Sequence, residues 1–345
     1  MRLRLFGVLL VGMTTLSGCY LSHVTAGQLE LVSRRQPISA LLADPATDEK
    51  LRRQLELVRQ ARAFSVNTLR LPDNASYSEY ADLGRPFVVW NVFAAKEFSL
   101  EPETSCFLFV GCLAYRGYFE EELAQRRARE LAARGLDVHI GAVAAYSTLG
   151  WFDDPVLNSM LRWDDDRLVE TLFHELAHQQ VFIPGDTEFN ESFATFVGAE
   201  GLRQFRAARR EPPPDRLRTE RERQFQVLVL DMRARLEALY ATPLEADAMR
   251  TAKRQEFERL RADYRKLRAS WSGYTGYDGW FMGELNNAKL LPVGLYHQWV
   301  LAFARLFRQS GRDWQRFYEI TAAWATLEPA ERSKRLKALN SGIQR

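Results

Sequence analysis

The sequence predicts an α+β fold that is mostly helical, with a small, mainly antiparallel sheet and a long helical hairpin. Apolar residues recur at helical spacing over most of the 345 residues. Runs rich in β-branched and aromatic residues are short and lie in the first half of the chain, which predicts a small sheet. One long charged segment repeats apolar residues at alternating steps of four and three, a pattern typical of two helices packed along a narrow seam.

The first nineteen residues differ from the rest of the chain. Two arginines precede an apolar run from Leu5 to Thr15, which ends in Leu16-Ser-Gly-Cys19. This order resembles a bacterial lipobox and implies a signal peptide over 1–18 with a membrane-anchoring lipid on Cys19. In Gram-negative lipoproteins, an Asp directly after the lipidated cysteine would oppose sorting to the outer membrane. Tyr20 stands at this position, which implies that the protein lies on the periplasmic face of the outer membrane. An uncleaved anchor helix, or an ordinary signal peptide with an unrelated cysteine, is the alternative.

The other two cysteines, Cys106 and Cys112, form an even pair in a chain predicted to be exported. Such pairs favour a disulfide, and two buried free thiols are the alternative.

A first region over 19–210 is expected to contain N-terminal helices, the small sheet and the central helices. Residues 20–70 read as helical with a break at Asp44-Pro45, and 74–86 read as a loop. The predicted strands and helices that follow are strands 87–93, 112–119 and 138–146, and helices 120–134, 165–181 and 187–208.

A charged helical hairpin is expected over 211–270, with a turn at Thr242-Pro243. It either binds a protein partner or simply packs on the main domain. Residues 271–283 are rich in aromatic residues and glycine and predict a loop. Two closing helices, 287–309 and 313–327, are expected in the final region, 271–345. The net charge of +3 is small, and its arginines alternate with acidic residues on helices, so nucleic acid is not an expected partner.

A His-Glu-x-x-His motif lies in the helix predicted over 165–181. His174 and His178 are four residues apart, so both imidazoles project from one helix face and can reach one ion. In such motifs the intervening glutamate, here Glu175, binds no metal but takes a proton from water. The spacing therefore predicts a Zn²⁺ site, and two histidines without a metal role are the alternative.

Zinc at a catalytic site needs a third protein ligand and one open position. The next predicted helix carries Asn190-Glu191-Ser-Phe-Ala194. The two motifs in this order resemble the gluzincin pattern of thermolysin-like proteases and zinc aminopeptidases, which implies Glu191 as the third ligand and a zincin-like domain. Glu188 and Glu200 are rival ligands. Thermolysin-like enzymes have an Asp four residues after this glutamate, and that Asp orients a metal-bound histidine. Thr195 stands at this position, so a different group must orient the histidine here.

The chain also resembles a narrower family, the bacterial putative aminopeptidases, which are predicted zinc lipoproteins of similar length. The resemblance rests on the lipobox and the two metal motifs, and on three further segments: Cys106-x5-Cys112-x2-Tyr115-Arg-Gly-Tyr-Phe119, Ala145–Phe152 and Asn286-Asn-Ala288. It covers nearly the whole mature chain. It implies a peptidase that hydrolyses peptide bonds in the cell envelope, with peptides as substrates.

Several residues are candidates for the remaining roles in such a reaction. Tyr296 is the favoured donor to the tetrahedral intermediate, with His297 and Tyr146 as alternatives. The strand that ends at Tyr146 is a candidate for pairing with an extended substrate. Glu97, Glu120 and Glu121 are candidates for holding a substrate amine, and the sequence does not choose among them.

Two other functions are compatible with these residues. One is an endopeptidase acting on envelope proteins. The other is a lipid-anchored scaffold with a structural zinc site, but structural sites are normally closed by four protein ligands, and this pattern offers three.

Overall fold

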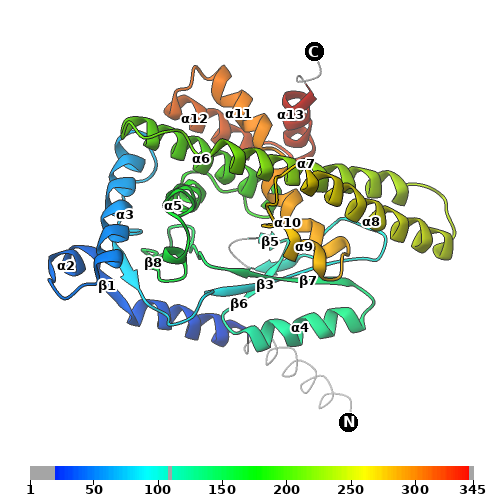
Figure 1. Ribbon diagram of the computed structural model, residues 1–345, viewed down its shortest axis with the longest axis horizontal. Coiled ribbons are helices and arrows are strands. Elements are labelled where there is room, and N and C mark those ends of the chain that lie inside the picture. Colours follow the sequence, from blue (N-terminus) through cyan, green and yellow to red (C-terminus); the bar gives the residue numbers. More distant parts are fainter. Residues whose placement is uncertain (1–19, 108–110, 342–345) are drawn as a thin grey trace, which may run out of the picture.

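A computed structural model describes residues 20–107 and 111–341 (Figure 1). It has the predicted α+β fold, in which helices predominate and the strands form small sheets of two or three members. Cys19 and the predicted signal peptide lie outside the described residues. None of the described helices is long and apolar enough to cross a membrane.

The strands of the described residues form three small sheets. One joins β1, β2 and β8, a second joins β6, β3 and β7, and a third joins β4 and β5. Their bounds are β1 Arg35–Pro37, β2 Glu79–Ala81, β3 Val89–Ala95, β4 Ser105–Phe107, β5 Gly111–Leu113, β6 Arg116–Tyr118, β7 Asp137–Val143 and β8 Val156–Leu157. All the pairs are antiparallel except β2 with β8, as the sequence led us to expect for most of the sheet.

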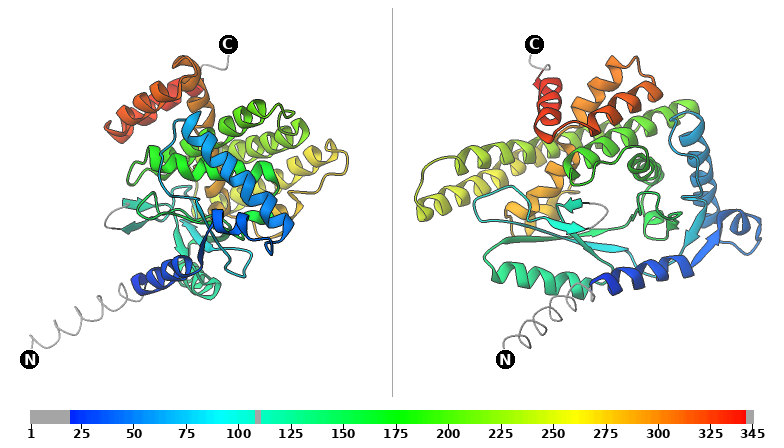
Figure 2. Two further views of the ribbon diagram at one scale, coloured as in Figure 1. Left: turned by 90° about the vertical axis from the view of Figure 1, so that its left-hand side faces the viewer. Right: turned by 180° about the vertical axis from the view of Figure 1, so that it is seen from behind.

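The helices surround and cover these sheets (Figures 1 and 2). Residues 20–33 form the first described helix. The others are α2 Ile38–Ala43, α3 Glu49–Asn67, α4 Glu121–Ala133, α5 Asp165–Gln180, α6 Thr187–Ala208, α7 Arg216–Tyr240, α8 Ala246–Ala269, α9 Asp278–Met282, α10 Asn287–His297, α11 Val300–Gln309, α12 Trp314–Ala325 and α13 Pro329–Ser341.

The helices α5 and α6 form the centre of the fold. Asp164 and Asp186 cap them, each accepting a hydrogen bond from a backbone N–H in the first turn of its helix. Gly198 and Gly201 in α6 allow α5 to approach closely, since an added Cβ at either glycine would lie 2.8 Å from an atom of α5. The largest apolar core surrounds this pair and includes α3, α11 and α12. This packing fixes the two helices relative to each other.

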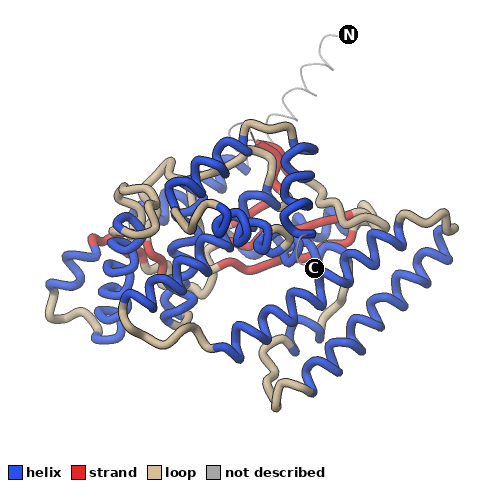
Figure 3. Tube along the Cα trace, turned by 90° about the horizontal axis from the view of Figure 1, so that it is seen from above, coloured by secondary structure: helices blue, strands red, loops and turns tan. Residues whose placement is uncertain are grey.

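The predicted helical hairpin is present as α7 and α8, which run side by side and extend from the body (Figures 1 and 3). Its seam is a separate apolar cluster that contains Phe225, Val229 and Met232 of α7, and Phe257 and Leu260 of α8. The predicted boundaries at 210 and 270 fall just after α6 and at the end of α8. The division into three regions stays a prediction.

Several elements differ from the sequence prediction. The strand β1 lies in the stretch 20–70 that was expected to be helical, and β2 lies in the expected loop 74–86. Residues 112–119 form two short strands, β5 and β6, and only β6 pairs with β3. The expected loop 271–283 contains the short helix α9, whose Phe281 is buried in the hairpin cluster. The expected helix 287–309 is divided into α10 and α11 near Trp299, which is buried against α6 through a contact with Glu188. In each case a tertiary contact overrides the local pattern.

The first described helix is tied to the body at its first residue. The Tyr20 hydroxyl donates to the Gly117 carbonyl at 2.9 Å, and the Arg116 guanidinium lies 3.7 Å above the Tyr20 ring. His23 Nε2 accepts a hydrogen bond from the Phe119 N–H. The helix and α4 lie end to end along one edge of the molecule (Figure 2).

Candidate metal centre

His174 and His178 lie one turn apart near the end of α5, with their rings nearly perpendicular and their Nε2 atoms pointing toward each other. Their Nε2 atoms are 3.2 Å apart. Glu191, in the second turn of α6, places Oε2 3.2 Å from His174 Nε2 and 3.4 Å from His178 Nε2. The structure therefore brings together the three residues predicted as ligands, and it offers them as a group able to hold a metal ion.

These separations match what one metal ion requires. Tetrahedral ligand atoms at about 2.0–2.1 Å from an ion lie about 3.3 Å from one another. The donor set, two imidazole nitrogens and one carboxylate oxygen, is also one that binds zinc and several other divalent ions. The residues therefore fit a mononuclear metal site with three protein ligands.

The charges in the site are strongly coupled. Burial alone would raise the pKa of Glu191, but His178 and His174 outweigh it and hold that pKa well below its usual range. Burial would lower the pKa of His178, but Glu191 outweighs it and raises the value. The carboxylate is thus kept ionised, as a metal ligand must be.

Glu175 directly follows His174 in α5. Burial raises the pKa of its carboxyl group, and the nearby Glu191 adds to the effect, while His174 and His178 partly oppose it. A carboxyl group with a raised pKa next to a metal site is suited to accepting and returning a proton.

Two tyrosines flank the Glu191 carboxylate. The Tyr115 hydroxyl donates a long hydrogen bond of 3.5 Å to Glu191 Oε1. The Tyr296 ring stacks on His174 with 5.8 Å between centroids and 16° between planes. Burial, with Glu191 next in effect, raises the pKa of both hydroxyls well above the usual value, so both remain protonated donors. Tyr296 was predicted to lie at the site.

Tyr115 had no predicted role at the site. The residue is 76 positions from Glu191, and no spacing rule connects the two. Its only signal was its place in the Tyr-Arg-Gly-Tyr-Phe segment that the family resemblance uses.

The residue at the position that orients a metal-bound histidine in thermolysin-like enzymes does not have that role here. Within the described residues, His178 Nδ1 and Thr195 Oγ1 are both buried without a hydrogen-bond partner. Thr195 stands at the position where an Asp would be expected from the gluzincin pattern, and it does not replace that Asp as a partner of the imidazole.

The alternative site residues lie elsewhere or have other contacts. Glu188 accepts a hydrogen bond from Trp299, and Glu200 pairs with Arg203 on the surface of α6. His297 is close enough to His174 for that residue to add to the effect of burial, which lowers the pKa of His297 to about 4. The Tyr146 ring packs against Phe119, 5.2 Å away.

The three carboxylates considered for binding a substrate amine do not meet the metal residues. Glu97 pairs with Arg250 of the hairpin, Glu120 pairs with His23, and Glu121 contacts Gln125 on the surface of α4. The strand considered for substrate pairing, β7, is an edge strand whose pairing with β3 ends at Val143.

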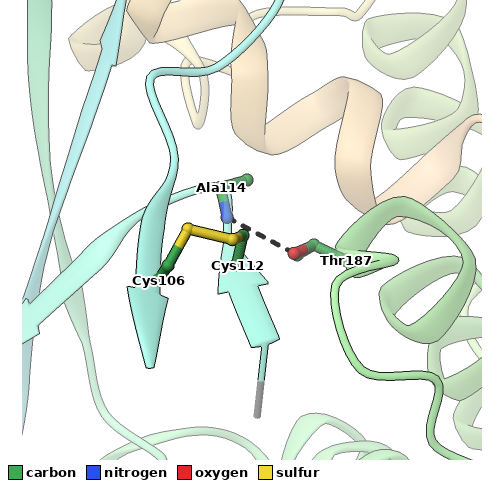
Figure 4. The surroundings of a disulfide bond; sticks show 4 residues. All are labelled: Cys106, Cys112, Ala114 and Thr187. Carbon is green, nitrogen blue, oxygen red and sulfur yellow. Dashed lines mark hydrogen bonds between the residues drawn. A yellow bond between two sulfur atoms is a disulfide. The ribbon is translucent and has the colours of Figure 1, made fainter. Parts of the chain in front are cut away.

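A disulfide joins Cys106 and Cys112 across the β4–β5 hairpin, as predicted (Figure 4). Just after it, the Ala114 N–H donates to Thr187 Oγ1 at the start of α6, at 3.4 Å. Gly111 lies against the loop between the two metal helices, where an added Cβ would be 2.7 Å from Gly185 N. The hairpin therefore braces the segment that positions Tyr115 and Glu191.

The fold and the site define a class of protein: an α+β protein with a His-Glu-x-x-His helix and a glutamate from the next helix grouped as a candidate metal site. The chain belongs to the family described as putative aminopeptidase, whose model matches residues 19–336. No curated protein and no solved structure gives a significant match.

Proposed function

We propose that the protein is a zinc-dependent aminopeptidase of the bacterial cell envelope. The observation that carries the proposal is the convergence of His174, His178 and Glu191, with Glu175 beside them. Family membership supports peptidase activity. A zinc ion held by these three residues would have a fourth position for water, as catalytic zinc sites do and structural ones do not.

The residues of the chain divide the chemistry among them. Bound zinc supplies a Lewis acid that lowers the pKa of water and polarises the substrate carbonyl. Glu175 accepts the proton from the attacking water and delivers it to the leaving amine. Tyr296, on the ring face of His174, donates a hydrogen bond to the oxygen that gains negative charge. Tyr115 holds Glu191 in the orientation that the metal requires.

The test is hydrolysis of peptides with free and with acetylated N-termini by zinc-loaded protein. An aminopeptidase cleaves only the free peptides. Cleavage of both kinds would instead identify an endopeptidase, and cleavage of neither would favour a scaffold. The matched variant is Glu175→Gln, which should keep its zinc by elemental analysis yet lose at least about a hundredfold in kcat. Undiminished activity in this variant would exclude Glu175 as the base.

The location is a separate part of the proposal. A lipid on Cys19 would hold the protein at the membrane, and the lipobox-like sequence before it supports this anchor. Cys19→Ala should release the protein into the soluble fraction. If the variant stays with the membranes after an alkaline wash, the lipid anchor is wrong.

A further inference from the structure

A cavity of about 500 Å³ opens beside the first turn of α6, and it is not lined by His174, His178 or Glu191. Leu291 and Leu295 of α10 line it, as do Cys112, Ala114 and Thr187. Figure 4 shows Cys112 and Ala114 beside Thr187. The volume lies within the usual range for ligand pockets, about 300–1,000 Å³. Glu188 and Arg233 bring opposite charges to this mostly apolar lining.

Arg233 projects from the hairpin helix α7 and has few partners. Its side chain is only 11% exposed, and Nη1 donates one hydrogen bond, 3.3 Å long, to the Leu290 carbonyl. The nearest carboxylate, Glu237, is 3.9 Å away and 61% exposed. A guanidinium has five N–H donors, so most of those on Arg233 have no close partner in the described part of the chain.

The position of Arg233 is fixed by α10. A Cβ added at Gly294 would lie 2.4 Å from Arg233 Cζ, so the guanidinium packs directly on the helix backbone at that glycine. The guanidinium is held against the helix, and its nitrogens without a protein partner are not sealed from solvent, so they face the cavity for their missing hydrogen bonds. It can obtain them from an anionic ligand in the cavity.

Glu188 is the counterpart of Arg233 in the cavity. Its Oε2 accepts a hydrogen bond from Trp299 Nε1 at 3.0 Å. Burial, the largest effect, raises the pKa of Glu188, whereas Trp299 and Arg233 lower it. The two charged groups are thus close enough to influence each other, yet among the described residues no ion pair within 4.0 Å joins them.

We infer that this cavity binds a zwitterionic amino acid or dipeptide with an apolar side chain. Its carboxylate meets Arg233, its ammonium group meets Glu188, and its side chain packs on Leu291 and Leu295. A zwitterion fits a gap between two opposite charges that do not reach each other. Glu101, Glu237 and Asp186, which pairs with Arg332, also line the cavity and disfavour ligands with acidic side chains.

The inference goes beyond the proposed function but is chemically related to it. Amino acids and short peptides are the products of an aminopeptidase, and Glu188 lies one helical turn before Glu191. Binding in the cavity requires no hydrolysis. It can therefore be measured on the full chain carrying Glu175→Gln, and its outcome is independent of whether the protein cleaves peptides.

The experiment is calorimetric titration of that chain with L-leucine, leucinamide and N-acetylleucine. Leucine should bind, whereas each derivative, which lacks one charge, should bind at least about tenfold more weakly. No heat of binding with leucine and with Leu-Leu would overturn the inference. Equal binding of all three leucine probes would also overturn it.

Variants assign each charge to its residue. Arg233→Met should weaken leucine binding at least about tenfold but leave the weak binding of leucinamide unchanged. Glu188→Gln, which can still accept the Trp299 hydrogen bond, should leave N-acetylleucine unchanged. Arg235→Met is the matched control, since Arg235 pairs with Glu256 and does not line the cavity. If Arg233→Met fails to fold, Glu188→Gln decides alone. Leucine binding at wild-type strength in a folded cavity variant would exclude the assignment.

Discussion

Gly198 of α6 lies directly against the backbone carbonyl of Glu170 on α5. A Cβ added at Gly198 would be 2.8 Å from that oxygen and 3.4 Å from His174 Cβ. The close approach of the two metal-site helices therefore depends on a residue without a side chain.

Gly198→Ala tests this contact. Alanine normally stabilises a helix by about 1 kcal/mol over glycine. Here we expect the opposite sign, a loss of about 1–3 kcal/mol in the free energy of unfolding, because the helices must separate. The measurement is denaturant unfolding. Gly279→Ala in α9 is the control, since no described atom beyond its chain neighbours and its own helix backbone lies within 4 Å of the added Cβ. A Gly198→Ala variant as stable as the control would show that the helices can move apart without cost.

Glu191→Gln tests the third ligand. Removing a residue that hydrogen-bonds to a metal ligand typically weakens metal binding about 10–100-fold. Removing the charge of the ligand itself should therefore weaken metal binding by more than about a hundredfold. Metal content after dialysis against a chelator measures this. Glu200→Gln on the same helix is the control, since Glu200 pairs with Arg203 and not with the histidines. Full metal retention by Glu191→Gln would remove Glu191 from the site.

The two tyrosines at Glu191 should have different functions. Tyr296→Phe should lower kcat about 10²–10³-fold, with metal content and KM unchanged, because it removes a donor used only in the transition state. Tyr115→Phe should weaken metal binding about 10–100-fold and leave kcat of the metal-saturated protein nearly unchanged. Measurements of kinetics and metal affinity on both variants separate the two roles. If instead Tyr115→Phe lowered kcat and Tyr296→Phe weakened metal binding, each role would belong to the other tyrosine.

Asp154 predicts a pH dependence of stability. The side chain is buried and accepts hydrogen bonds from the Thr148 N–H and hydroxyl, both at 2.8 Å. Burial outweighs these bonds and raises its pKa from 3.8 to about 6. The native state therefore binds more protons than the unfolded state between about pH 4 and 6, so this group favours folding below that window and opposes it above.

Asp154→Asn should remove this effect. Relative to the wild type, the variant should gain about 2–3 kcal/mol in unfolding free energy between about pH 4 and about pH 7. The free energy lost with the Thr148 hydrogen bonds is the same at both pH values, so it cancels when the two pH values are compared. Asp153→Asn, at an exposed neighbour, should show no such gain. A pH-independent difference between Asp154→Asn and the wild type would contradict the buried, protonated state.

The sequence predicted best where periodicity and motif spacing carry the information. The metal helix was expected over 165–181 and is Asp165–Gln180, because a capping aspartate and the residues before Pro184 mark its ends. The i, i+4 histidines and the glutamate of the next helix met as expected, since a short turn forces the two helices together.

Contacts between distant segments could not be predicted in the same way. Tyr115 reaches Glu191 only because the disulfide hairpin packs on the loop before α6. The cavity residues Glu188 and Arg233 lie 45 positions apart, on helices whose relative placement no local pattern encodes. The short strands β1, β2 and β8, two or three residues each, are defined by their pairing and not by their own sequence.

The attachment of Tyr20 to Gly117 and Arg116 bears on how far the protein can reach. If Cys19 carries the acyl chains, no flexible linker separates the lipid bilayer from the folded body, because Tyr20 is already attached to it. The folded body would then have a fixed height and orientation above the lipid headgroups. It would not move freely at the end of a flexible linker. Peptides that diffuse close to the membrane would be encountered, and those deeper in the compartment would be out of range.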